Sequence, residues 1–212
     1  TYWRDPGEAG VPPSFDWSGS QNVALVEVMW PRPEIFISFG MRTVGYSGDL
    51  VLPLRVTPKN AELPISLAVH ARMGVCKEIC VIEEVELSKD IAPDLRPIGY
   101  KQIRRAVASV PMPVADAAMR LVSCRIVGTG RDREMHAELE FDTDPGHTDI
   151  VVEGHENLWV RKTHITKQGG SVHLEAQLRL PMDVSWIDRS SLRMTVLAET
   201  FAADIQGCVP TG

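Results

Sequence analysis

The most constraining feature of this sequence is a pair of cysteines, Cys76 and Cys80, separated by three residues and preceded by Gly74. Two thiols this close can form and exchange a disulfide if the backbone brings both sulfurs within bonding distance. A crosslink that closes about five residues stabilises a fold by roughly 2 kcal/mol in the chain-entropy treatment. The ring of about 85 residues that Cys124 and Cys208 would close contributes about 4.6 kcal/mol in the same treatment. We therefore interpret Cys76 and Cys80 as a labile redox pair, and Cys124 and Cys208 as a structural pair.

Two alternatives stay open at this point. The first pair is also compatible with an inert crosslink or with two idle buried thiols, because thiolate character and strain decide reactivity. Cys124 and Cys208 are also compatible with two free thiols, because spacing alone does not fix connectivity.

Composition and charge restrict the class of protein. The chain has 212 residues, 44% of them hydrophobic, and a formal net charge of −6, so we expect no nucleic-acid partner. It contains no apolar run long enough to span a bilayer and no signal-peptide pattern at its start, so we expect a soluble chain without direct membrane insertion, its targeting segment removed. Four cysteines, one pair far apart in sequence, favour an oxidising compartment over the cytosol.

The first half of the chain reads as short strands divided by turns. We expect strands at residues 22–30, 50–56, 65–70 and 81–87, rich in β-branched residues, with Pro53 restricting its strand to an edge or a bulge. The cysteines then lie at or near the tip of a β-hairpin. This placement argues against a thioredoxin fold, in which two closer cysteines open a helix.

The second half predicts a further set of strands after a short helix. The spacing of Ile103, Val107 and Val110 predicts a helix over residues 100–110. Alternation in residues 135–141 directs the odd positions inward. We expect an all-β fold of two β-sandwich parts, residues 1–95 and 116–212, joined by a helix-containing linker at residues 96–115. The other expected strands of this half are residues 121–127, 149–153, 158–165, 172–180 and 192–201.

Three segments resemble the N-terminal periplasmic domain of the thiol:disulfide interchange protein DsbD and its ScsB-like relatives. They are Thr1–Ser20 with its Thr-Tyr-Trp-Arg opening, Gly45–Pro53 before the hairpin, and Gly74–Cys80 itself. The resemblance covers roughly residues 1–90. The cysteine spacing here is shorter than in the best-known DsbD members, so their hairpin geometry is not transferred in detail.

The resemblance implies immunoglobulin-like sandwiches in the periplasm and a disulfide relay. Its partners would be a membrane-embedded thiol reductant and periplasmic thioredoxin-like acceptors, and it would act without a cofactor, as a protein-disulfide reductase or electron-relay component. Cys80 would form the mixed disulfide with partners and Cys76 would resolve it, while Phe39 would cap the disulfide. The second sandwich would be a scaffold or docking module. The resemblance leaves open whether such a relay serves cytochrome c biogenesis, disulfide isomerisation or copper tolerance.

Two rival functions come from other classes. His70, Met73, Cys76 and Cys80 provide imidazole, thioether and thiolate groups that suit Cu(I), although their spacing fits a helix and the segment reads as strand and turn. A non-catalytic sandwich with two structural disulfides is the other rival. A structural zinc site lacks a second close cysteine pair, so we expect no metal, and hydrolase motifs such as Gly-x-Ser-x-Gly are missing from the sequence.

Overall fold

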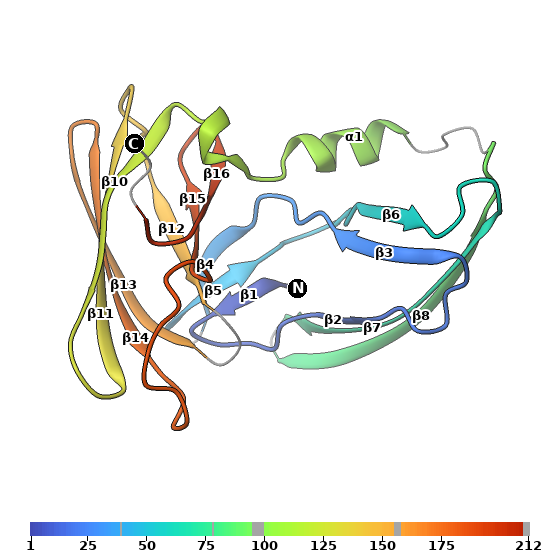
Figure 1. Ribbon diagram of the computed structural model, residues 1–212, viewed down its shortest axis with the longest axis horizontal. Helices are drawn as coiled ribbons and strands as arrows, with labels where there is room; N and C mark the ends of the chain where they lie inside the picture. Colours follow the sequence, from blue (N-terminus) through green and yellow to red (C-terminus); the bar gives the residue numbers. More distant parts are fainter. Residues whose placement is uncertain (39, 78, 95–99, 155–157, 210–212) are drawn as a thin grey trace. The chain divides into compact units, whose positions relative to one another are not determined.

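The structure is a computed structural model that describes residues 1–38, 40–77, 79–94, 100–154 and 158–209. Its regular elements are nearly all strands, which confirms the predicted all-β class (Figure 1). The chain divides into two compact units, Thr1–Val110 and Pro111–Gly212. This division falls inside the stretch that was expected to form the linker, and it groups the helix with the first unit.

Over its described residues, the first unit contains three small sheets and one helix. Their strand orders are β1-β5-β4, β2-β7-β8 and β3-β6. In the described residues, the long β7–β8 hairpin is the largest paired segment of this unit. The elements are β1 (Tyr2–Gly7), β2 (Ser14–Asp16), β3 (Val23–Val28), β4 (Glu34–Ser38), β5 (Met41–Gly45), β6 (Leu54–Pro58), β7 (Ile65–Cys76), β8 (Cys80–Ile91) and α1 (Tyr100–Ala108).

The second unit is a two-layer β-sandwich. Its sheets have the orders β10-β11-β14-β13 and β12-β15-β16-β9. All its strand pairs are antiparallel except β16 with β9, which is parallel. The elements are β9 (Met112–Pro113), the 3-10 helix Val114–Asp116, β10 (Met119–Val127), β11 (Asp132–Phe141), β12 (Asp149–Glu153), β13 (Trp159–Gln168), β14 (Ser171–Arg179), β15 (Arg193–Leu197) and β16 (Ala202–Gln206).

The core of the second unit follows from strand alternation. Met135, Ala137, Leu139 and Phe141 of β11 are buried, which confirms that the odd positions point inward. Facing residues of the other sheet, such as Met194, complete one continuous apolar cluster. Burial on this scale is the main favourable contribution to the stability of the unit.

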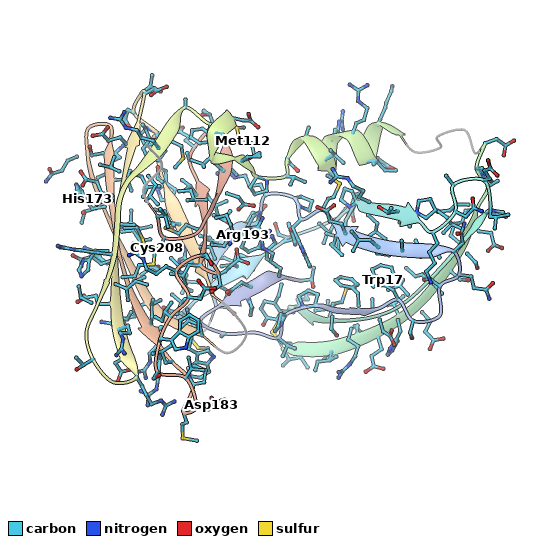
Figure 2. All side chains as sticks on the ribbon, viewed as in Figure 1. Trp17, Met112, His173, Asp183, Arg193 and Cys208 are labelled. Atoms are coloured by element: carbon cyan, nitrogen blue, oxygen red, sulfur yellow. A yellow bond between two sulfur atoms is a disulfide. The ribbon has the colours of Figure 1, made fainter. Side chains whose placement is uncertain are left out.

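The first unit has a much sparser core. Among the described residues, only Tyr2, Trp3, Val44 and Ala71 are buried hydrophobic residues of this unit. Phe15 contributes ring contacts with Trp17 (labelled in Figure 2) and with Trp30, at centroid distances of 5.8 and 6.1 Å. The two units therefore differ in how they are stabilised, the first by hydrogen-bonded hairpins and a few aromatic contacts, the second by a dense aliphatic core.

Several predicted element boundaries are wrong. The strand expected at residues 50–56 begins only at Leu54, because Pro53 has no N–H to donate to a ladder. The strand expected at residues 192–201 ends at Leu197 as β15, and the chain then turns and returns as a separate strand, β16, which pairs with β15. The strands β1, β2, β4, β5 and β9 were not predicted. By contrast, α1 lies within the predicted helical stretch of residues 100–110.

Asn22 positions the connection that leads into β7. Its backbone has a φ of 57°, in the left-handed region where asparagine is tolerated better than most residues. Its side-chain Oδ1 accepts a hydrogen bond from the Asn60 N–H at 2.8 Å. Its Nδ2 donates to the carbonyl oxygens of Asn60, Leu63 and Pro64, at 2.9, 2.9 and 3.1 Å. One side chain therefore holds the start of β3 against the turn that precedes β7.

We predict that Asn22→Ala lowers the free energy of unfolding of the first unit by about 1–2 kcal/mol, because it adds backbone strain and removes these hydrogen bonds. Asn22→Gly adopts the positive φ without strain but also lacks the hydrogen bonds. Its free energy of unfolding should therefore lie between those of Asn22→Ala and the unaltered protein. Urea unfolding of both variants measures the effect. Equal stability of Asn22→Ala and the unaltered protein would contradict this role.

Candidate functional site: a disulfide at the tip of a hairpin

The cysteine pair lies where two twelve-residue strands meet. β7 and β8 pair from Ile65 with Ile91 to Cys76 with Cys80 without a register shift. The two cysteines are therefore direct cross-strand partners, with 4.1 Å between their Cα atoms, and they form a disulfide. Beyond them the N–H of Lys77 donates to the carbonyl oxygen of Ile79 at 3.1 Å, which closes the turn. The continuous ladder explains why the two sulfurs meet.

The disulfide is accessible. Cys76, Lys77 and Cys80 are all exposed, and Ile79 between them is 73% exposed. Accessibility is the first requirement for exchange with a thiol on another protein, because the attacking sulfur must reach the disulfide. The side chain of Lys77 projects from this turn, where solvent screens its charge.

Tyr2 supplies a polar contact that the sequence analysis did not identify. Its hydroxyl oxygen lies 3.2 Å from the sulfur of Cys80 and 3.2 Å from that of Cys76. A disulfide has no hydrogen to donate, so the hydroxyl is the donor. Tyr2 belongs to β1, pairs with Gly45 of β5, and is only 9% exposed. A rigid, buried ring therefore presents its one polar atom to both sulfurs.

Two glycines create the space for the Tyr2 ring. A Cβ added at Gly74 would lie 2.7 Å from two ring carbons of Tyr2, and one at Gly10 would lie 2.5 Å from a third. Atoms do not approach this closely, so either side chain would displace the ring. Gly74 stands two residues before Cys76 on the same strand. Gly74, which stands beside the cysteines in the sequence, thus has a packing role. It was the sequence feature from which a bulky side chain packed against this part of β7 could have been inferred.

The second disulfide has a different environment. Cys124 of β10 and Cys208, which follows β16, are bonded, and both are buried (Figure 2 labels Cys208). The Nη2 of Arg189 donates to the carbonyl oxygens of both cysteines at 2.6 Å. The backbone on either side of this bond is therefore also held by a guanidinium group. Burial makes it a poor target for exchange, in contrast with the first pair.

The proposed copper ligands do not converge in this geometry. His70 and Cys76 lie six residues apart on one strand, which corresponds to roughly 20 Å. Met73 points to the opposite face of β7 from Cys76, because side chains alternate along a strand. His70 instead lies with its Nε2 3.4 Å from a carboxylate oxygen of Glu84 on the neighbouring strand. In the described part of the chain, no group of three or more His, Cys, Asp or Glu residues is arranged to hold a metal ion.

The residue predicted to cap the disulfide is not among the described residues. Residues 35–38 of the segment expected to contain it belong to β4. Phe39 itself lies outside the described residues, so its role as a cap stays a prediction.

Fold and site together define a class: an all-β protein with a solvent-accessible disulfide at a hairpin tip and a second, buried disulfide. Residues 1–92 match the family described as the N-terminal domain of the thiol:disulfide interchange protein DsbD. This match includes Tyr2, Cys76 and Cys80, and it confirms the resemblance inferred from the sequence for this part of the chain.

The whole chain also resembles a solved structure. The crystal structure of the N-terminal periplasmic domain of ScsB from Proteus mirabilis aligns with a TM-score of 0.73 and 19% sequence identity. The alignment covers 100% of this chain and 83% of that one, so both units share its fold. A search of curated proteins gave no significant match. Among the helices that the structure describes, none is long and apolar enough to cross a membrane.

We predict that Tyr2→Phe slows alkylation of the reduced protein by iodoacetamide at pH 7 by roughly two- to fivefold. Loss of a hydrogen bond worth about 1 kcal/mol lowers the thiolate fraction, and the higher nucleophilicity of the remaining thiolate offsets part of the effect. Gly74→Ala should act in the same direction by displacing the ring.

Tyr46→Phe is the matched control. In the unaltered protein the Tyr46 hydroxyl donates a hydrogen bond to the carbonyl oxygen of Pro31 at 2.8 Å, away from the cysteines. Burial raises the pKa of Tyr46, and the charge of Arg4 opposes this shift. This variant should leave the alkylation rate unchanged. Equal rates for Tyr2→Phe and the unaltered protein would show that the hydroxyl does not assist the thiols.

Proposed function

We propose that this chain is a periplasmic thiol–disulfide exchange protein. It relays reducing equivalents from a membrane-embedded thiol reductant to thioredoxin-like acceptors through Cys76 and Cys80. The observation that carries the proposal is the exposed Cys76–Cys80 disulfide at the end of an uninterrupted hairpin. The family match over the segment that contains both cysteines supports it.

The exchange needs no group beyond the two thiols and their partners. In the reduced protein, the Cys80 thiolate attacks the disulfide of an oxidised acceptor. A bond forms between Cys80 and one acceptor sulfur, and the other acceptor sulfur leaves as a thiolate. Cys76 then attacks the Cys80 sulfur, which releases the acceptor fully reduced and leaves the Cys76–Cys80 disulfide. Two electrons pass to the acceptor, and the membrane reductant restores the dithiol.

Three features near the disulfide contribute to these exchange steps. The Tyr2 hydroxyl, 3.2 Å from both sulfurs, stabilises whichever sulfur carries negative charge. The ladder between β7 and β8 holds Cys76 opposite Cys80, so the resolving thiol is already in place. The exposed turn lets a folded partner protein approach the two sulfurs. The second unit, which holds its own disulfide buried, acts as a scaffold or docking module, and the identity of the acceptor determines which process the relay serves.

Trapping of the mixed disulfide tests the assignment of roles. We predict that reduced Cys76→Ala forms a stable covalent adduct with an oxidised thioredoxin, used as a probe acceptor, because the resolving thiol is missing. Cys80→Ala should form at least tenfold less adduct. Non-reducing electrophoresis and peptide mapping measure both. The double variant Cys124→Ala/Cys208→Ala, with both hairpin cysteines present, should exchange at the unaltered rate if it folds.

Two results would contradict the proposal. Adducts through Cys76 in the Cys80→Ala variant, at the level seen for Cys76→Ala, would reverse the two roles. No adduct with either variant, while both remain folded by circular dichroism, would exclude exchange with this class of acceptor.

A further inference from the structure

One edge of β8 is open in the described part of the chain. In the sheet β2-β7-β8, this strand has β7 as its one neighbour among the described residues. Every described residue from Cys80 to Asp90 is exposed, over most of the length of the strand. An open strand edge presents backbone N–H and C=O groups that can pair with an added strand. Here the open edge starts at a cysteine.

The backbone of Cys80 faces this edge. The Cα atoms of Cys76 and Cys80 are 4.1 Å apart, close to the spacing of about 4.5 Å for non-hydrogen-bonded antiparallel pairs and well below the 5.5 Å of hydrogen-bonded pairs. In a non-hydrogen-bonded pair, the N–H and C=O groups of each residue point away from the partner strand. The register has no shift, so Ile82, Glu84 and Glu86 repeat this orientation. The outward-facing amide groups therefore follow the open edge from Cys80, and the exchanging sulfur stands on the adjoining face of the sheet at the start of that edge.

We propose that β8 binds an extended segment of the acceptor protein by strand addition from Cys80 to Glu86 during disulfide exchange. The inference rests on the proposed function and specifies how the partner docks. The acceptor strand aligns its own cysteine with Cys80, and its main-chain groups bind the outward-facing amides. Strand addition brings the two sulfurs together and holds the mixed disulfide until Cys76 resolves it.

Charge and polarity define the partner segment. Residues 80–91 contain the acidic residues Glu83, Glu84, Glu86 and Asp90 and the single basic residue Lys89, a net charge of −3. Glu84 is paired with Arg72 of β7, with 2.8 Å between Nε and a carboxylate oxygen, so Glu83 and Glu86 supply the negative charge near Cys80. Exposed apolar side chains stand among the acidic residues, with Ile82 50% and Leu87 62% exposed. The complementary occupant is a segment that alternates apolar residues with Lys or Arg. A second copy of this chain would bring the same negative strand, and like charges across paired strands are unfavourable.

A peptide probe tests the proposal. The probe is a ten-residue peptide of alternating Val and Lys around one Cys, supplied as its mixed disulfide with glutathione. Reduced protein should exchange with it roughly tenfold faster than with oxidised glutathione. Backbone N-methylation of alternate residues, or 0.5 M salt, should remove most of this advantage, because the first blocks strand pairing and the second screens the charges.

Glu86→Pro and Glu86→Ala form the matched pair of variants. Both remove the carboxylate, but only proline removes the outward N–H, and proline is tolerated where that N–H faces solvent. Glu86→Pro should lose the advantage for the peptide, and Glu86→Ala should keep most of it. Both should react with oxidised glutathione at the unaltered rate. In the peptide adduct of Cys76→Ala, the amides of Ile82, Glu84 and Glu86 should gain protection from hydrogen exchange.

The outcomes separate the two proposals. Equal rates for the peptide, its N-methylated form and oxidised glutathione would overturn strand addition while leaving the exchange function intact. Equal peptide rates for Glu86→Pro and Glu86→Ala, with normal glutathione reactivity, would do the same. A reduced protein that reacts with neither probe would overturn the proposed function and strand addition together.

Discussion

The register of the β7–β8 hairpin is the constraint on which the candidate site depends. Twelve consecutive cross-strand pairs bring Cys76 directly opposite Cys80. A slip of one residue would place the two side chains on opposite faces of the sheet, where their sulfurs cannot bond. The same register turns the backbone of Cys80 toward the open edge and sets Gly74 beneath the ring of Tyr2. The disulfide, the hydroxyl contact and the outward orientation of the Cys80 amide all depend on this one pairing pattern.

The two units hold their disulfides in different environments. The second unit buries its disulfide in a sandwich core and clamps both cysteine carbonyls with Arg189. The first unit leaves its disulfide exposed at a strand end and buries few hydrophobic residues among those described. The proposed exchange requires a sulfur that another protein can reach, and an accessible strand end is incompatible with a deep core around it. The chain therefore holds one solvent-exposed disulfide and one buried disulfide.

Local sequence patterns predicted much of the fold and the cysteine pair of the candidate site, but not the Tyr2 contact. Alternation in β11 identified its buried face, and the paired runs around Cys76 and Cys80 predicted the hairpin. Tyr2 was not found because it reaches the disulfide through a non-local pairing of β1 with β5, in a segment whose Asp5, Pro6 and Gly7 read as loop. The break between β15 and β16 carries no Gly or Pro, so periodicity had no signal for it.

The central claim, that the hairpin disulfide is the exchanging one, is tested most directly by redox titration of the purified protein in glutathione and dithiothreitol buffers. Thiol trapping with mass spectrometry would locate each reduced cysteine. The account predicts that Cys76 and Cys80 titrate together within the range of about −120 to −270 mV of known thiol–disulfide carriers, while Cys124 and Cys208 stay protected. A hairpin disulfide that never forms, or that resists reduction below about −300 mV, would contradict it.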